Sequence, residues 1–273
     1  MSKDSAVEKK KEELFYSPAH VAKVVEDDEI QRADAFCDGY IEFLNIAKTE
    51  REVTDYMLSA AQKAGYTEFD KSKKYKPGDK VYRVNRDKAI MLCVFGKKDI
   101  KDGVKIAAAH IDSPRLDLKP NPVYEADEMA FFKTHYYGGI KKYQWTAIPL
   151  SLHGVVIKAD GEKVTVKIGE DDGDPKFVIT DLLPHLGQEQ MKRTLAEGIK
   201  GEELNILIGS RPFKGDKESE LVKLNILSLL NEKYGIVEKD FLSAELELVP
   251  AFKADDIGFD RSMIGAYGHD DRV

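Results

Sequence analysis

The chain has 273 residues and a mass of 30.7 kDa, which suits one large domain or two smaller ones. Its 42 basic and 49 acidic side chains give a net charge of −7, with no block of basic residues. General nucleic-acid binding needs a clustered basic surface, so the composition argues against nucleic-acid partners. No apolar run approaches the roughly 18 residues of a membrane span, so no membrane partner is expected either.

The cysteines and the N-terminal segment bear on the compartment. Cys37 and Cys93 are too few for a disulfide framework, and neither belongs to a Cys-x-x-Cys pair. Such cysteine usage is typical of a reducing compartment. The N-terminal segment is charged but lacks the apolar stretch of a secretory signal. We therefore expect a cytoplasmic protein.

The first part of the chain predicts helices followed by a sheet. Apolar residues recur at helical spacing over 29–49 and again over 51–64. Three strand candidates follow, at 81–84, 89–95 and 104–111. The last two are nearly continuous apolar runs, which are typical of strands buried on both faces.

The pattern changes after Pro120, where short alternating segments are separated by Gly, Asp and Pro. These segments predict strands at 150–157, 163–168 and 176–179. A broad apolar face predicts a helix at 221–234, and strict alternation predicts a half-exposed strand at 241–249. We therefore place domain boundaries near residues 120 and 252.

Signatures of several enzyme classes are absent. The sequence contains no HExxH, GxSxG, GxxxxGK[ST] or GxGxxG. Zincins, elbow-type serine hydrolases, P-loop enzymes and Rossmann dehydrogenases are therefore not indicated.

The segment Ala-Ala-Ala-His-Ile-Asp-Ser-Pro at 107–114 places His110 and Asp112 at the end of a predicted strand. Strand ends are where open α/β sheets hold their sites. Side chains two residues apart on a strand point the same way, so Asp112 could orient a metal-bound His110. The alternative is a buried histidine bonded to the backbone, with Asp112 capping a turn.

The final segment, Gly-Ala-Tyr-Gly-His-Asp-Asp-Arg-Val, also carries metal-ligand types. Its neighbouring carboxylates, Asp270 and Asp271, and His269 are donors that zinc accepts. Bridging two zinc ions needs a carboxylate with both oxygens free. The alternative is a charged, solvated terminus.

Two further segments have weaker signals. In Thr-His-Tyr-Tyr-Gly-Gly-Ile at 134–140, the glycine pair allows the backbone to approach a ligand or to bend tightly. The alternative there is a hairpin with ordinary aromatic residues. Leu-Leu-Pro-His-Leu at 182–186 contains His185, for which the alternative is a packed histidine.

Segments 109–114, 135–140, 183–186 and 267–272, in this order, resemble the aminopeptidase I / aspartyl aminopeptidase family of di-zinc metallopeptidases. The resemblance covers the chain from about residue 30 to its last residue. It implies an α/β fold, in which a metallopeptidase catalytic domain is interrupted by a β-rich insertion used in dimerisation. It also implies peptide substrates and self-association into a dodecamer built from dimers.

Mapped onto this chain, the resemblance implies three parts. Residues 1–120 would be the N-terminal part of the catalytic α/β domain. Residues 121–252 would be the β-rich dimerisation or assembly domain. Residues 253–273 would return to the catalytic domain and end at the metal-bridging Asp motif.

The resemblance also implies roles for individual residues. The complete enzyme would hold two Zn²⁺ ions per active site, with Co²⁺ or Mn²⁺ as alternatives. His110 would bind one zinc ion, and Asp112 would orient the site. Asp270, rather than Asp271, would bridge the metals. His185 would reach the active site of a neighbouring subunit.

The sequence departs from the family because it stops at Val273. The family's Glu-Glu pair with the general base, a further ligand Asp and a C-terminal ligand His are missing. A two-metal site needs about three protein ligands per ion, and only two credible ones are present. We therefore expect the N-terminal portion of a zinc aminopeptidase that releases N-terminal residues from peptides with a zinc-activated water. This chain alone would be inactive.

Two alternatives remain. One is a non-catalytic truncated subunit or assembly scaffold. The other is a different di-zinc hydrolase, such as a carboxypeptidase or a deacylase, because these enzymes share the chemistry of the metal core.

Overall fold

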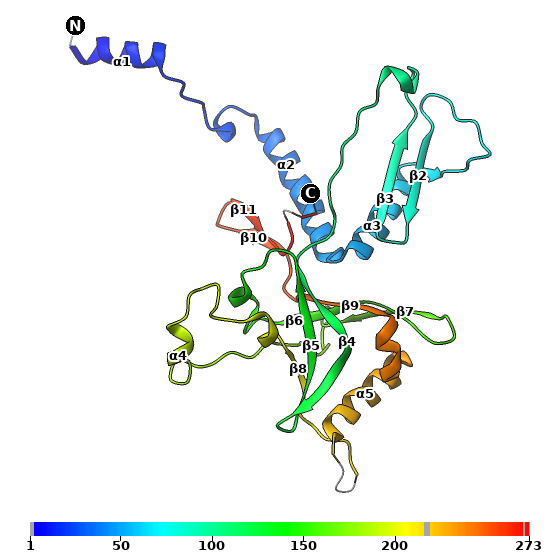
Figure 1. Ribbon diagram of the computed structural model, residues 1–273. Helices are drawn as coiled ribbons and strands as arrows, with labels where there is room; N and C mark the ends of the chain where they lie inside the picture. Colours follow the sequence, from blue (N-terminus) through cyan, green and yellow to red (C-terminus); the bar gives the residue numbers. More distant parts are fainter. Residues whose placement is uncertain (1–2, 216–218, 270, 273) are drawn as a thin grey trace. The chain divides into compact units, whose positions relative to one another are not determined.

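The computed structural model describes residues 3–215, 219–269 and 271–272. By its internal contacts the chain divides into two units, Met1–Glu42 and Phe43–Val273. The first unit contains helix α1 (Lys3–Leu14), a 3-10 turn and most of helix α2 (Asp27–Ile46), all labelled or coloured blue in Figure 1. The fold is mixed α/β, as the sequence predicts.

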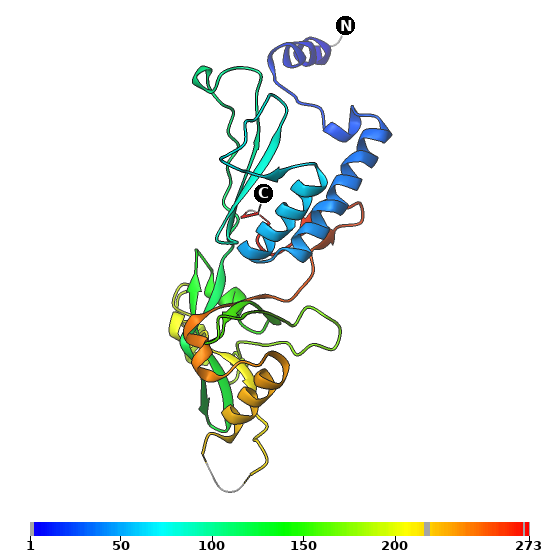
Figure 2. The same ribbon diagram turned by 90° about the vertical axis from the view of Figure 1, so that its right-hand side faces the viewer.

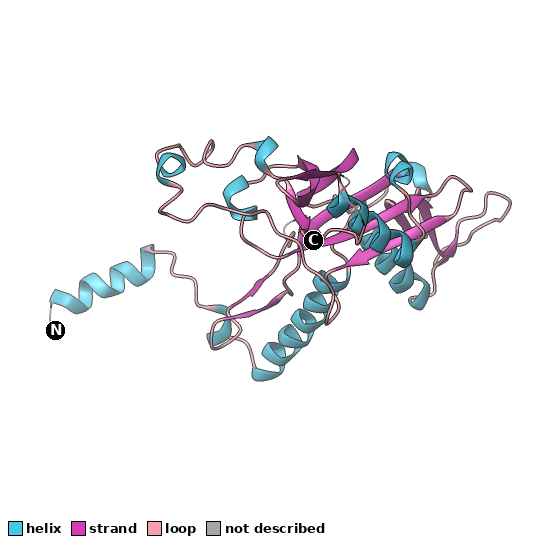
Figure 3. Ribbon diagram, turned by 90° about the horizontal axis from the view of Figure 1, so that it is seen from below, coloured by secondary structure: helices cyan, strands magenta, loops and turns pink. Residues whose placement is uncertain are grey.

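The largest sheet of the second unit has six strands in the order β7-β6-β9-β4-β5-β8, and every neighbouring pair is antiparallel. Figure 3 shows its long strands as neighbouring arrows with helices beside them. Helix α5 (Leu221–Tyr234) packs against β4, β5 and β8. The short helix α4 (Gln188–Met191) lies in the long connection before β8. The strands are β4 (Arg115–Ala126), β5 (Met129–Tyr137), β6 (Leu150–Ile157), β7 (Lys163–Ile168), β8 (Ile206–Gly209) and β9 (Ala244–Pro250).

Two smaller sheets complete the second unit. Strands β1 (Thr67–Glu68), β2 (Lys80–Asn85) and β3 (Ala89–Val94) form a sheet that helix α3 (Glu50–Lys63) packs against, as Figure 2 shows. Strands β10 (Asp255–Ile257) and β11 (Met263–Gly265) form an antiparallel hairpin.

Several predicted elements are confirmed. The helices predicted at 29–49, 51–64 and 221–234 correspond to α2, α3 and α5. The strands predicted at 150–157 and 163–168 are the hairpin β6–β7. These segments are long and strongly periodic, so local sequence is enough to define them.

The prediction of buried strands at 89–95 and 104–111 is wrong in its burial. The first forms β3, but it pairs only with β2, and Met91 is 70% exposed. The second has no strand pairing among the described residues, and Ile106 is 81% exposed. An apolar run becomes a buried strand only where strands on both sides and covering helices are provided. Among the described residues, β3 has a strand on one side only, and 104–111 has no strand partner.

Two other strand predictions need correction. Residues 176–179 form only isolated bridges. Segment 241–249 begins in a 3-10 turn, Glu238–Ser243, and continues as β9, which is buried from Leu246 onward rather than half-exposed. Strand β9 lies between β6 and β4, so both of its edges are paired. The domain boundaries near 120 and 252 stay predictions.

The core of the six-stranded sheet is made by alternate apolar side chains. Each fully buried large side chain contributes roughly 1.5–3 kcal/mol relative to an exposed one. Those with relative exposure of 2% or less include Leu116, Phe132, Leu150, Leu152, Ile206 and Leu248.

A group of charged residues, the α3 joint, attaches the start of α3 to this sheet. Thr49 and Glu52 form a capping box at the helix N-terminus. Glu52 Oε1 also lies 2.8 Å from His153 Nδ1 on β6, and His153 Nε2 lies 3.0 Å from Glu170 Oε1. Lys48 Nζ completes the joint with a 2.8 Å bond to Glu170 Oε1. His153 and Lys48 are 1% and 2% exposed, so solvent does little to screen these charges.

A second group, the Arg115 cluster, lies between α3, β4 and β9. The Arg115 guanidinium is 2.8 Å from Asp117 Oδ1, 3.4 Å from Glu247 Oε2 and 3.5 Å from Glu50 Oε2. Lys88 adds a 2.9 Å contact to the other Glu50 oxygen. Burial, together with the neighbouring Glu50 carboxylate, raises the pKa of Glu247 well above its ordinary value.

Both groups predict that the free energy of unfolding falls as pH rises from about 6 to about 8. Burial opposes the charging of His153, but the carboxylates of Glu170 and Glu52 outweigh it and raise the pKa of His153. A raised folded-state pKa gives a contribution that is fully present below the unfolded-state pKa and lost as pH rises through the folded value. His153 and Glu247 both have this sign.

Chemical denaturation at a series of pH values measures this slope. His153→Gln and Glu247→Gln should each flatten it, whereas His20→Gln, at an exposed histidine outside both groups, should leave it unchanged. A wild-type stability that is constant or increases over this range would contradict the assigned protonation behaviour.

Candidate metal centre

His110 and Asp112 lie on the irregular segment that precedes β4. His110 Nδ1 is 3.1 Å from Asp112 Oδ1 and 3.1 Å from the Asp112 backbone oxygen. In the neutral imidazole, this geometry places the proton on Nδ1 and the lone pair on Nε2. The hydrogen bond to the Asp112 carboxylate also raises the pKa of His110. The ring is 61% exposed, so Nε2 is accessible to a metal ion.

The second carboxylate oxygen of Asp112 is also bonded. Tyr137 Oη at the end of β5 donates a 2.5 Å hydrogen bond to Asp112 Oδ2. This bond is the main cause that lowers the pKa of Asp112, and it raises the pKa of Tyr137. Asp112 is therefore a charged acceptor held between a tyrosine hydroxyl and an imidazole.

The β4–β5 hairpin positions this tyrosine. Tyr137 is the cross-strand partner of Arg115, and the Arg115 guanidinium carbon lies 4.1 Å from the ring centroid. Gly138 follows with φ +81°, and a Cβ there would come within 3.3 Å of Pro114 Cγ. The turn after β5 thus fits closely against the chain that carries Asp112.

The segment that contains the Asp-Asp-Arg motif is anchored beside the same strand. Tyr267 Oη donates a 2.6 Å hydrogen bond to the Pro114 carbonyl. Arg272 is 2% exposed. Its guanidinium donates hydrogen bonds to backbone carbonyls of its own segment and to backbone carbonyls at the end of α2. The acceptors are Tyr267, Gly268, Leu44 and Ala47.

The anchoring brings the two predicted metal motifs together. His110 Nε2, the atom with the lone pair, lies 3.9 Å from Asp271 Oδ1. Asp270, the predicted bridging ligand, lies outside the described residues. An imidazole nitrogen and a carboxylate are ligands that zinc prefers, so the donors fit this metal. No group of three His, Cys, Asp or Glu side chains that could hold a metal occurs among the described residues.

His185 lies in an exposed turn between β7 and α4. Within the described part of the chain, no hydrogen bond or ion pair connects it to His110 or Asp112. Its predicted role at a neighbouring subunit therefore stays a prediction.

Sequence reasoning missed two residues that shape the site. It selected the 134–140 segment for its glycines, but not the Tyr137 hydroxyl as a partner of Asp112. It did not single out Arg115. The alternation Arg-Leu-Asp-Leu that starts at residue 115 is the signal for β4, and it could have placed this arginine on a strand face.

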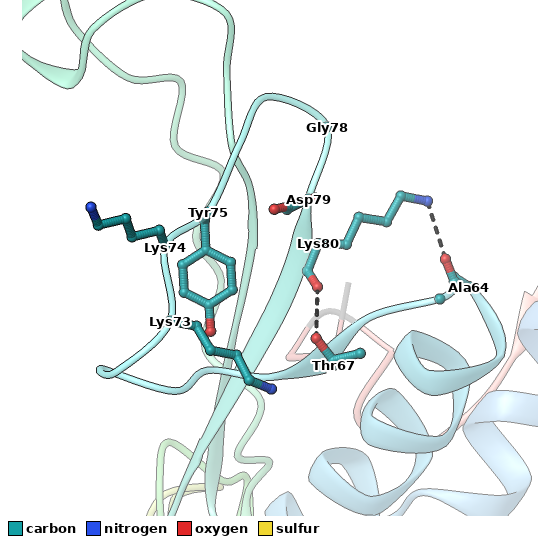
Figure 4. Close-up of a pocket in the computed structure, with 9 residues that line it drawn as sticks. Ala64, Thr67, Lys73, Lys74, Tyr75, Gly78, Asp79 and Lys80 are labelled. Carbon is teal, nitrogen blue, oxygen red and sulfur yellow. Dashed lines mark hydrogen bonds between the residues drawn. The ribbon is translucent and has the colours of Figure 1, made fainter.

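A pocket in the described part of the chain lies away from these residues. A cavity of about 610 Å³ opens between the end of α3 and the loop before β2. Figure 4 shows Lys80 Nζ donating to the Ala64 carbonyl and the Thr67 hydroxyl donating to the Lys80 carbonyl across it. None of the predicted site residues lines it, so we assign it no role in the chemistry.

Known proteins resemble this chain over most of its length. The profile of the family described as "Aminopeptidase I zinc metalloprotease (M18)" matches residues 43–273. The chain belongs to the M18 family. A curated M18 relative, the "Probable M18 family aminopeptidase 1" of Clostridium acetobutylicum, is 50% identical over 252 residues, which are 91% of this chain and 54% of that protein.

Solved M18 structures share the fold. A crystal structure of an M18 aminopeptidase from Thermotoga maritima has a TM-score of 0.87 and 45% identity, over 94% of this chain and 56% of that chain. The structure of aminopeptidase I from Borrelia burgdorferi B31 has a TM-score of 0.83 and 43% identity, over 93% of this chain and 58% of that chain. The chain thus spans about half the length of the M18 relatives that it matches. None of its described helices is long and apolar enough to cross a membrane.

Proposed function

We propose that this chain supplies the first metal ligands of a zinc aminopeptidase that removes N-terminal residues from peptides. The observation that supports this most is the 3.9 Å distance between His110 Nε2 and Asp271 Oδ1 in the Asp-Asp-Arg segment. Two motifs that are distant in sequence thus place metal-binding atoms side by side. Membership of the M18 family, which is described as a zinc metalloprotease, agrees with the choice of metal.

Each site residue has a distinct role in this proposal. His110 binds zinc through Nε2, and Asp112 fixes the ring by accepting from Nδ1. Asp270 would be a further metal ligand in this proposal, and Arg272, two residues on, is bonded to the carbonyls of Gly268 and Leu44. Zinc, when bound, supplies a Lewis acid that activates water and polarises the peptide carbonyl.

The ligands and the general base that complete the site are proposed to lie in polypeptide that corresponds to the unmatched half of the relatives.

We also propose the division into catalytic and assembly parts at residues 120 and 252. The return of 253–273 to the N-terminal part is supported by a 2.7 Å bond from the Ala254 amide to Asn45 Oδ1. The Arg272 bonds to Leu44 and Ala47 support it again. Residues 121–252 would then serve self-association.

Replacing His110 tests the metal assignment. His110→Ala should lower the Zn²⁺ affinity of the chain by at least about 100-fold, because it removes a direct ligand. Titration calorimetry on the metal-free chain measures this affinity. His135→Ala, at an exposed histidine on the neighbouring strand β5, is the matched control and should bind zinc as the wild type does. Equal affinity of His110→Ala and wild type would sink the proposed site.

The segment around His185 tests self-association. It exposes several apolar side chains, and Leu183 and Leu186 are 67% and 72% exposed. An exposed apolar patch is typical of an interaction surface. Light scattering should show a dimer or a larger assembly for the wild type. Leu186→Glu should shift the mass toward the monomer, whereas Met91→Glu, at a residue that is 70% exposed on β3, should not. A monomeric wild type would rule out assembly by this chain alone.

A further inference from the structure

Among the described residues outside the 110–112 segment, Tyr137 is the one that donates a hydrogen bond to the Asp112 carboxylate, and its hydroxyl bonds one specific oxygen. Oδ2 accepts from Tyr137, and Oδ1 faces His110 Nδ1. A carboxylate held at one oxygen cannot rotate freely about its terminal bond. The tyrosine bond therefore determines which oxygen, and which direction, Asp112 offers to the imidazole.

The tyrosine ring is itself held from two sides. Its face lies against the Arg115 guanidinium at 4.1 Å, and the guanidinium is fixed by ion pairs with Asp117, Glu247 and Glu50. The next residue, Gly138, packs against Pro114, and little space is left there for a side chain. The hydroxyl position is thus set by the strand pairing rather than by the exposed segment that carries His110.

Among the described residues, the hydrogen bonds of the His110 ring all go to Asp112, and Asp271 Oδ1 lies 3.9 Å from its Nε2. His110 lies on an irregular stretch in which the preceding residues, from Gly103 onward, are exposed. The imidazole is therefore oriented through Asp112, and Asp112 through Tyr137.

We propose that Tyr137 is a positioning residue of the metal centre, which holds Asp112 so that His110 keeps its proton on Nδ1 and presents Nε2 to the metal ion. The role of Tyr137 at a metal ion rests on the proposed function. Its effect on the tautomer of the His110 imidazole can be measured without metal.

The test uses the tautomer of His110 as its readout. The chain is labelled with ¹⁵N-histidine, kept free of metal and studied by NMR at alkaline pH, where the imidazole is neutral. His110→Ala identifies the His110 signals among the six histidines. In the wild type, the Nδ1–H form should predominate. In Tyr137→Phe, which keeps the ring on Arg115, the signals should shift toward the Nε2–H form that is preferred in free histidine.

Tyr136→Phe is the matched control. It removes the same hydroxyl from the adjacent residue of β5, and the two tyrosines are similarly exposed, at 37% and 41%. It should leave the His110 tautomer unchanged. Asp112→Ala gives the reference for complete loss of the Nδ1–H preference.

The proposal would be overturned if the His110 signals of Tyr137→Phe matched those of the wild type while those of Asp112→Ala were shifted. An Asp112→Ala spectrum equal to that of the wild type would also overturn it, because Asp112 would then not control the ring.

Zinc affinity gives a second and separate readout. Tyr137→Phe should weaken Zn²⁺ binding by about 10-fold, the lower end of the effect expected for residues behind a metal ligand, and Tyr136→Phe should not. If His110→Ala binds zinc like the wild type, the proposed function fails, whereas the tautomer measurement still decides the role of Tyr137. If His110→Ala loses zinc and Tyr137→Phe does not change the tautomer, only the present inference fails.

Discussion

The Arg115 guanidinium is buried among carboxylates, and its position constrains both the large sheet and the candidate site. An arginine does not lose its charge inside a protein, so its burial requires compensating carboxylates. The carboxyl groups around it come from three elements, with Glu50 on α3, Asp117 on β4 and Glu247 on β9, and the raised pKa of Glu247, about 8, keeps that group largely protonated at neutral pH. The arginine therefore connects the first helix of the second unit with the centre of the sheet. Removing it would leave acidic side chains buried without their counter-charge.

The same side chain extends its effect to the candidate metal centre by a short series of contacts. Arg115 holds the Tyr137 ring, Tyr137 bonds Asp112, and Asp112 bonds His110. The proposed ligand His110 lies on an irregular, exposed segment, but Arg115 and Tyr137, at the far end of this series, lie on a paired hairpin. Metal sites depend on such support, because a ligand is useful only in one orientation. The α3 joint attaches helix α3 to the sheet at a second place, through the bonds of His153 to Glu52 and Glu170.

Local patterns in the sequence predicted the parts of the fold that local patterns can define. Helices α3 and α5 and hairpin β6–β7 follow from periodicity alone. The apolar run at 104–111 suggested a buried strand, but burial depends on partners that a local pattern does not contain. The pairing of β4 with β5 was missed because the turn at 127–128 has no glycine, although both residues adopt positive φ.

The candidate site was predictable only in part for the same reason. His110 and Asp112 were selected from their spacing and from the family resemblance, and their role at a metal stays a prediction. The Tyr137 bond and the Arg115 contact arise from strand register, which is a tertiary property. Zinc-edge anomalous diffraction from crystals of the chain grown with Zn²⁺ tests the account most directly. A zinc peak is expected about 2.0–2.1 Å from His110 Nε2, with Nδ1 still bonded to Asp112. Zinc bound at Nδ1, or zinc held elsewhere with His110 unliganded, would contradict it.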